Sequence, residues 1–213
     1  MKTLTKEMQA EITPQKALEL LEAGNNRFID NLKINRNLLQ QVNETSDGQH
    51  PFAVILSCID SRTSVELIFD QGLGDVFSIR IAGTIINEDI LGSLEFACKV
   101  SGSKIIVILG HTKCGAIKGA CDNVEMGNLT VLLEKIQPAV HAEQTTHKNR
   151  NANNQEFVEN VTAINIRRTV KAILERSPIL KKMVENGECG IVGGNHDITT
   201  GKVSFYKDTM HGF

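Results

Sequence analysis

Short apolar runs alternate with amphipathic segments along most of this chain, and the alternation predicts its fold. Runs rich in β-branched residues predict strands at 52–58, 75–81, 104–109, 189–193 and 202–206. Between them, apolar residues recur at helical spacing over 88–100, 114–121 and 154–176. Strands separated by helices form βαβ units, so we expect an α/β fold with a mainly parallel central sheet flanked by helices. The last run follows Thr199-Thr200-Gly201 and is expected to form an antiparallel edge strand near the C-terminus.

The N-terminal segment has a different pattern and predicts a helical arm over residues 1–45. Thr13 and Pro14 form a favourable helix start. One face of a helix from 14 to about 32 then carries the apolar residues Leu18, Leu21, Phe28 and Leu32. This stripe needs cover, which either the same chain or a second copy can supply. We treat 1–213 as one domain, with the arm followed by a sheet core and C-terminal helices at 50–213.

Composition and charge exclude several functional classes. The 213 residues are 41% hydrophobic and 23% charged, which is ordinary for a globular protein. The net charge of −2 gives no basis for binding nucleic acid or an anionic membrane. No apolar run reaches the roughly 18 residues that a membrane-spanning helix needs. Five cysteines, an odd number, and an N-terminus without an apolar leader predict reduced thiols and a cytoplasmic location.

Two of the predicted strands are followed directly by residues that bind soft metal ions. Cys58 ends the first strand, and His111 and Cys114 follow the third strand. Because the carboxyl ends of parallel strands meet at one edge of a sheet, we expect these side chains to lie close together. Two thiolates and one imidazole suit Zn²⁺, and three protein ligands leave one position open, as in catalytic zinc sites. Each residue alone has an ordinary structural explanation, and the coincidence of the two segments is what indicates a metal site.

An acidic and a basic residue accompany the first of these ligands. Asp60 lies two residues after Cys58, so an extended chain turns both side chains the same way. Arg62 can bind that carboxylate through its forked guanidinium group. By itself, an Asp/Arg pair at this spacing is more often an ordinary ion pair. Beside a predicted metal ion, it becomes a candidate catalytic dyad.

Together these residues resemble the β-class carbonic anhydrases. The resemblance rests on two motifs and two flanking segments: Cys58-x-Asp60-x-Arg62, His111-x-x-Cys114, Gly48-Gln49-x-Pro51 and Arg80-x-Ala82-Gly83. It implies a zinc enzyme that reversibly hydrates carbon dioxide to bicarbonate and a proton through zinc-bound hydroxide. It also implies that the two cysteines and the histidine of these motifs hold the zinc. Asp60, held by Arg62, then takes part in catalysis and becomes an alternate fourth ligand if Arg62 releases it.

The resemblance further implies an assembly and a substrate pocket. The family forms dimers or multiples of dimers in which the N-terminal helices pack on the partner, so we expect a homo-oligomer. The plant-like, open-site branch fits best and implies substrate contacts at Gln49, Phe77, Phe96 and Gly115. Phe96 replaces the tyrosine usual in that branch, and Thr84 stands where the family usually has asparagine. On pattern alone, Phe77 and Phe96 would be core residues and Gln49 a loop residue.

Two other functions share the same predicted metal site. Relatives of the family hydrolyse carbonyl sulfide or carbon disulfide, and pocket size would separate such an enzyme from a carbonic anhydrase. A zinc-stabilised binding protein without turnover is the other alternative. The presence of Asp60 and Arg62 argues against it, because a purely structural zinc site does not need such a pair.

Overall fold

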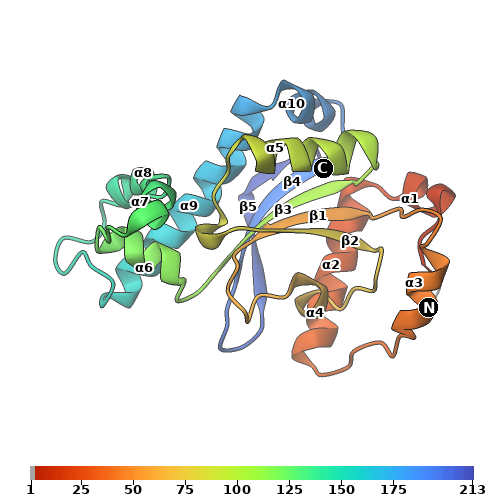
Figure 1. Ribbon diagram of the computed structural model, residues 1–213, viewed down its shortest axis with the longest axis horizontal. Coiled ribbons are helices and arrows are strands. Elements are labelled where there is room, and N and C mark those ends of the chain that lie inside the picture. The colour runs from red at the N-terminus through yellow and green to blue at the C-terminus, as the bar shows by residue number, and fades with distance from the viewer. Residues whose placement is uncertain (1–2) are drawn as a thin grey trace.

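The computed structural model describes residues 3–213, which form a five-stranded sheet with helices on both faces (Figure 1). Its strand order is β2-β1-β3-β4-β5, in which the first four strands are parallel and β5 runs antiparallel to β4. The strands are β1 (Ala53–Ser57), β2 (Val76–Arg80), β3 (Ile105–His111), β4 (Gly190–His196) and β5 (Val203–His211). The predicted mainly parallel α/β fold with an antiparallel edge strand is therefore confirmed.

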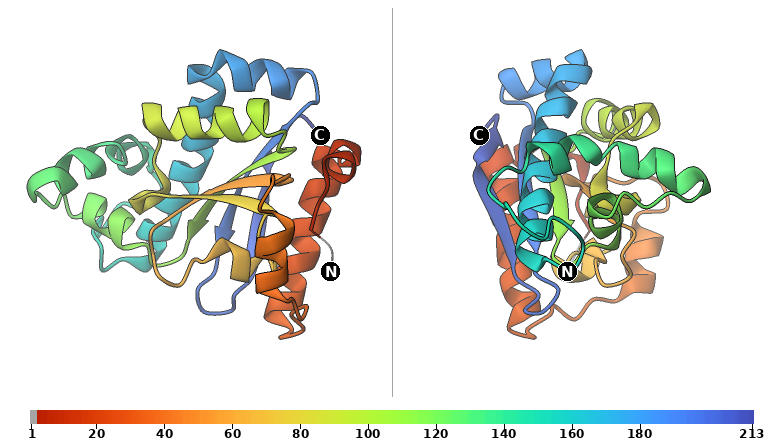
Figure 2. Two further views of the ribbon diagram at one scale, coloured as in Figure 1. Left: turned by 45° about the vertical axis from the view of Figure 1, so that its right-hand side comes forward. Right: turned by 90° about the vertical axis from the view of Figure 1, so that its left-hand side faces the viewer.

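Alternate residues of the central strands face two separate hydrophobic cores. Val54 and Leu56 of β1 pack in the core beneath the helices α5 (Glu88–Glu95), α9 (Gln155–Arg176) and α10 (Pro178–Glu185). Ala53 and Ile55 face the opposite core, beneath α2 (Pro14–Ile29) and α4 (Val65–Ile68). Figure 2 shows α2 along one face of the sheet and α9 along the other. Helices on both faces explain why β1 and β3 are continuous apolar runs.

Several short helices were not predicted, because four to eight residues carry too little periodic pattern to be recognised. They are α4, α7 (Gly127–Glu134), α8 (Gln137–Ala142) and α10, while α1 (Lys6–Glu11) and α3 (Leu38–Glu44) lie within the predicted helical arm. Helices α7 and α8 lie beside α6 (Gly115–Cys121) at the end of the molecule distant from the arm (Figure 1). The predicted helix at 88–100 divides into α5 and a π-helical turn, η2 (Phe96–Val100). Within residues 3–213, none of the helices has the length and apolar character needed to cross a bilayer.

The arm covers its apolar stripe partly with its own sheet. Leu18 and Leu21 of α2 are buried in the core that α2 shares with β1 and β3. Beyond α2, Leu32 remains 68% exposed, and Leu39 of α3 remains 71% exposed. The same chain therefore supplies cover for α2 and leaves the later part of the arm uncovered.

A buried carboxylate fastens the arm to the sheet core. Asp70 follows α4, has a side chain only 3% exposed, and forms ion pairs with Arg27 of α2 and with Arg36. Burial alone would raise the pKa of Asp70, but the two guanidinium groups outweigh burial and hold this pKa below its ordinary value. Because the Arg36 side chain is also buried, water could not solvate its charge if the Asp70 carboxylate were removed.

We expect Asp70→Asn to lower the free energy of unfolding by about 3–5 kcal/mol at neutral pH, because it leaves a buried cation unpaired. Asparagine is chosen because it tolerates the positive φ of 44° at this position.

The folded-state pKa of Asp70 is depressed, so the stabilisation that its carboxylate provides is complete at neutral pH and is lost as the pH falls below about 4. Urea titrations of parent and variant should therefore converge in acid. The control Asp208→Asn breaks an exposed pair with Arg167 and should cost less than about 1 kcal/mol; equal losses in the two variants would contradict the argument.

Candidate metal centre

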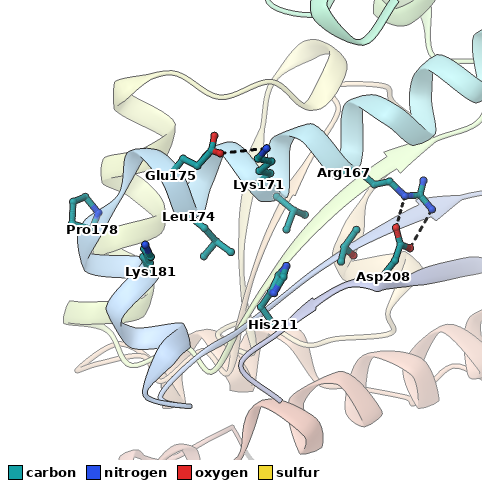
Figure 3. Close-up of a pocket in the computed structure, with 10 residues that line it drawn as sticks. Arg167, Lys171, Leu174, Glu175, Pro178, Lys181, Asp208 and His211 are labelled. Carbon is teal, nitrogen blue, oxygen red and sulfur yellow. Dashed lines mark hydrogen bonds and ion pairs between the residues drawn. The ribbon is translucent and has the colours of Figure 1, made fainter. Parts of the chain in front are cut away.

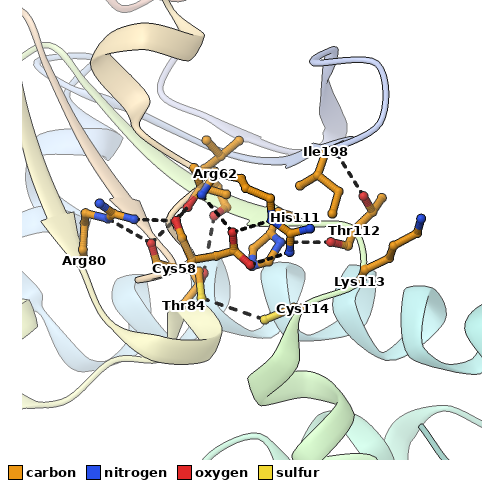
Figure 4. Close-up of polar contacts among 12 residues, drawn as sticks. Cys58, Arg62, Arg80, Thr84, His111, Thr112, Lys113, Cys114 and Ile198 are labelled. Atoms are coloured by element: carbon orange, nitrogen blue, oxygen red, sulfur yellow. Dashed lines mark hydrogen bonds and ion pairs between the residues drawn. The ribbon is translucent and has the colours of Figure 1, made fainter. Parts of the chain in front are cut away.

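The carboxyl ends of β1 and β3 bring the three predicted metal ligands together. Cys58 follows β1 directly, His111 is the last residue of β3, and Cys114 immediately precedes α6. Since β1 and β3 are adjacent and parallel, their ends lie side by side. One ligand atom from each residue lies within 4.8 Å of the others, and all three residues are buried. Figure 4 shows this group together with its polar contacts.

The geometry of these atoms fits a tetrahedral zinc ion. The Sγ atoms of Cys58 and Cys114 are 3.9 Å apart, close to the roughly 3.8 Å that two Zn–S bonds of about 2.3 Å give at a tetrahedral angle. His111 Nδ1 lies 2.9 Å from the Thr112 carbonyl oxygen, which fixes the proton on Nδ1. Nε2 is buried and has no hydrogen-bond partner within residues 3–213, so the neutral ring presents a free lone pair there. This orphaned nitrogen beside two sulfurs is what a metal ligand requires.

The two thiols influence each other strongly. Hydrogen bonding from Cys114 lowers the pKa of Cys58 well below that of an ordinary thiol. The same interaction, together with burial, raises the pKa of Cys114. The pair thus favours one thiolate even before a metal ion is considered, and the thiolate is the form of cysteine that binds metal.

The predicted dyad lies next to the ligand group. Arg62 donates from Nε to Asp60 Oδ1 at 2.9 Å and from a terminal nitrogen to Oδ2 at 2.7 Å. The Arg62 backbone N–H also donates to Oδ1, at 3.0 Å. These bonds hold the pKa of Asp60 well below its usual range. Asp60 Oδ2 lies 4.0 Å from His111 Nε2, so an ionised carboxylate borders the metal position while remaining bound to Arg62.

Two residues for which no role was predicted hold the backbone between Cys58 and Asp60. Arg80, at the end of β2, donates from Nε to the Cys58 carbonyl at 3.1 Å and from a terminal nitrogen to the Asp60 carbonyl at 2.6 Å. The Thr63 hydroxyl lies within hydrogen-bond distance of the same two carbonyl oxygens. Arg80 belongs to a segment that carries the family resemblance, and that was its only signal in the sequence. Thr63 had none, because its contact depends on the turn.

The turn after β2 explains why asparagine would be expected at Thr84. Thr84 has a φ of +53°, in the left-handed region that asparagine tolerates and that is an outlier for a β-branched residue. Its hydroxyl lies 3.4 Å from the Leu109 carbonyl oxygen of β3, and its own carbonyl accepts from Thr169 of α9. Threonine therefore keeps the turn attached to β3 and α9 despite the unfavourable backbone conformation.

A second buried histidine lies beside the metal centre. His196 pairs with His111 in the register of β3 and β4, and it is only 3% exposed. Both of its ring nitrogens lack a hydrogen-bond partner within the described residues. Burial, followed by the proximity of His111, lowers the pKa of His196 to about 4, so its ring is neutral at neutral pH. Sequence reasoning missed this position, because only strand register brings it next to His111.

The predicted substrate contacts divide into two groups. Gly115 adjoins Cys114 at the start of α6. Phe77 and Phe96 pack edge-to-face, with ring centroids 6.3 Å apart, and line a hollow of about 590 Å³ over β2 and α5 that contains none of the metal ligands. Phe77 pairs with Val54, four residues before Cys58, which corresponds to about 13 Å along the strand. Gln49 lies in the exposed loop before β1.

Another hollow, of about 710 Å³, lies between α9, α10 and β5 (Figure 3). Its charged side chains are largely paired within it: Arg167 with Asp208, and Lys171 with Glu175. None of the residues that line it belongs to the ligand group or to the dyad. Among the described residues, Cys58, His111 and Cys114 are therefore the group that could hold a metal ion. The ionised carboxylate of Asp60 lies beside this group.

Comparison with known proteins gives a consistent result. The family profile described as carbonic anhydrase matches residues 53–203. Carbonic anhydrase 2 of Mycobacterium tuberculosis is 32% identical over 197 residues, covering 89% of this chain and 91% of that protein. A carbonic anhydrase of Mycolicibacterium smegmatis is 30% identical over 196 residues, covering 89% and 92%. A carbon disulfide hydrolase of Acidithiobacillus thiooxidans matches only 33% of this chain, at 34% identity.

A solved structure agrees with these sequence matches. The β-carbonic anhydrase CcaA superposes with a TM-score of 0.70 at 25% identity, covering 91% of this chain and 95% of that one. The profile match spans the strands that carry the ligand group, and the curated relatives match over nearly their full length. This chain belongs to the β-carbonic anhydrase family.

Proposed function

We propose that this protein reversibly hydrates carbon dioxide to bicarbonate and a proton, with Zn²⁺ held by Cys58, His111 and Cys114. The observation that carries the proposal is the convergence of two sulfurs and an imidazole nitrogen that has no hydrogen-bond partner in the described chain, next to a carboxylate that Arg62 keeps ionised. A zinc ion with three such ligands supplies a Lewis acid that makes a water molecule acidic enough to give hydroxide near neutral pH.

The protein side chains orient the attacking oxygen. Asp60 is ionised and therefore only accepts hydrogen bonds, because Arg62 lowers its pKa. By accepting the O–H of the nucleophile, Asp60 directs a lone pair of that oxygen toward the carbon of the substrate. The contact from His111 Nδ1 to the Thr112 carbonyl fixes the imidazole ring, and Arg80 fixes the backbone of Cys58. Catalysis thus relies on groups that are in place before substrate arrives.

We propose the open site as the working state and the closed site as its alternative. The three hydrogen bonds from Arg62 support the open state, since they hold Asp60 away from the metal. If Arg62 released the carboxylate, Asp60 would be close enough to become the fourth ligand, because Oδ2 is already 4.0 Å from His111 Nε2.

We propose a homo-oligomer built from dimers through the arm. Support comes from the exposed apolar residues Leu32 and Leu39 and from Phe96, which is 54% exposed beside the hollow over β2. Gln49, Phe77 and Phe96 are retained as proposed substrate contacts, together with Gly115. Because Phe77 lies far from the metal along its own strand, contact with a substrate there requires these aromatic side chains to come from a second copy. Five unpaired thiols fit a reducing compartment, so we propose the cytoplasm as the location.

We expect purified protein to contain about one zinc per chain and Cys58→Ser to lose it on dialysis against a chelator, because a hydroxyl is a poor ligand in a thiolate site. The matched control is Cys121→Ser, which alters another buried free thiol outside the ligand group and should keep its zinc. Metal content by mass spectrometry reports both. Full zinc retention in Cys58→Ser would refute the ligand assignment.

Asp60→Asn should keep its zinc and lose about 100-fold in kcat/KM for carbon dioxide hydration, because an amide cannot be held as an ionised acceptor. Stopped-flow assays with a pH indicator measure the rate. Asp208→Asn breaks a similar carboxylate–guanidinium pair far from the metal and should keep parental activity. Unchanged activity in Asp60→Asn would remove this residue from the mechanism.

Faster turnover of carbon disulfide than of carbon dioxide by the parent protein would reassign the substrate, and zinc without any turnover would leave a binding protein.

Leu39→Glu should shift the mass in solution from a multiple of dimers toward the 23.4 kDa single chain, because it places a charge in the proposed arm interface. Size-exclusion chromatography with light scattering gives the mass directly. Val131→Glu is the control, since this residue of α7 is 56% exposed and distant from the arm. An unchanged oligomer in Leu39→Glu would place the interface elsewhere.

A further inference from the structure

The turn that joins His111 to Cys114 adopts an unusual backbone conformation. Only Thr112 and Lys113 separate the two ligands, so this turn determines how their side chains meet. Lys113 has a φ of +57°, in the left-handed region that a lysine adopts only at an energetic cost. Figure 4 shows Lys113 between the strand that ends at His111 and the helix that follows Cys114. Some contact has to hold the chain in this conformation.

Thr112 is held by the end of β4. Its backbone N–H donates to the His196 carbonyl at 3.0 Å. Its hydroxyl accepts from the Ile198 backbone N–H at 3.1 Å. These bonds attach Thr112 to the end of β4. They do not hold Lys113, the residue with the left-handed backbone conformation.

Lys113 is held by a carboxylate from α9. Its backbone N–H donates to Glu159 Oε1 at 2.9 Å, across 46 positions of the chain. The second oxygen, Oε2, is buried and has no hydrogen-bond partner within the described residues. Burial raises the pKa of Glu159, and the Lys113 amide and the charges of His111 and Lys118 offset this only in part. Packing alone does not explain this half-buried carboxylate, because burying its second oxygen without a partner is unfavourable.

A helix-stabilising role does not explain Glu159 either. Acidic residues near a helix N-terminus interact favourably with the helix dipole, and Glu156, in the first turn of α9, already does so from an exposed position. Glu159 lies three residues further along and turns toward the ligand turn instead. The hydrogen bond that Glu159 accepts from the Lys113 amide therefore distinguishes it from Glu156.

We infer that Glu159 is a positioning residue of the metal centre. By accepting the Lys113 amide hydrogen, it holds the turn in the conformation that sets His111 Nε2 and Cys114 Sγ around one ion. The inference rests on the proposed metal centre and deepens it. A turn that is already arranged needs less ordering when metal binds, so Glu159 increases metal affinity without touching the metal.

The test is zinc affinity, measured by competition with a chromophoric chelator. Glu159→Ala should weaken zinc binding by about tenfold, the lower end of what loss of a metal-supporting contact causes. Glu159→Gln should retain most of the affinity, because its amide oxygen can accept the same hydrogen bond. The matched control Glu156→Ala should bind zinc like the parent. In cobalt-substituted protein, Glu159→Ala should also shift the thiolate-to-cobalt absorption bands, since the ligand geometry changes.

A glycine at position 113 tests the mechanism. Glycine adopts the left-handed conformation without steric cost, so Lys113→Gly should reduce the affinity loss that Glu159→Ala causes. An equal loss in both backgrounds would overturn the role assigned to the turn. Parental zinc affinity and cobalt spectrum in Glu159→Ala would overturn the inference as a whole. Should Glu159→Ala fail to fold alone, the comparison is made in the Lys113→Gly background, where the added Glu159→Ala change should cost little zinc affinity and a tenfold loss would overturn the role assigned to the turn.

The proposed metal centre and the proposed role of Glu159 can be refuted separately. If Cys58→Ser binds zinc as tightly as the parent, the metal centre itself is wrong and the inference falls with it. If Cys58→Ser loses zinc while Glu159→Ala keeps it, the metal centre stands and only the role of Glu159 is removed.

Discussion

The metal centre depends on the parallel pairing of β1 with β3 in one particular register. Ser57 pairs with Leu109, so Cys58 and His111 leave the sheet at nearly the same level on adjacent strands. A slip of one residue would turn every side chain of a strand to the opposite face. The ligand group would then be lost, although each strand would still bury apolar residues on both faces. The chemistry therefore rests on a pairing that hydrophobic burial alone does not specify.

Elements from across the molecule secure the two ligand segments once the strands are paired. Arg80 of β2 and the nearby Thr63 bind the carbonyl groups of the Cys58–Asp60 turn. The end of β4 binds Thr112, and α9 supplies Glu159 to Lys113. Most of these bonds join residues distant in sequence, so ligand geometry is a property of the whole sheet and its helices.

Electrostatics separates the two carboxylates near the metal position. Asp60 is bound by the forked guanidinium of Arg62 and stays ionised. Glu159 has a backbone amide as its partner, and burial raises its pKa. The first carboxylate lies 4.0 Å from His111 Nε2 beside the candidate metal ligands, and the second accepts the Lys113 amide hydrogen from the turn between two of them. The pKa values of two chemically similar groups thus shift in opposite directions because their surroundings differ.

The sequence by itself determined the strands and the fold class, and it singled out the three residues that meet in the candidate metal centre. Apolar β-branched runs followed by Cys58 and by His111 are local patterns, and they are legible without coordinates. The helices α7 and α8 were too short to leave such a pattern. Only the tertiary structure decided strand register, which separates Phe77 from the metal and brings His196 beside His111. It also decided the contacts of Arg80 and Glu159, because long-range hydrogen bonds depend on where folding brings the chain together and leave no periodic trace in the sequence.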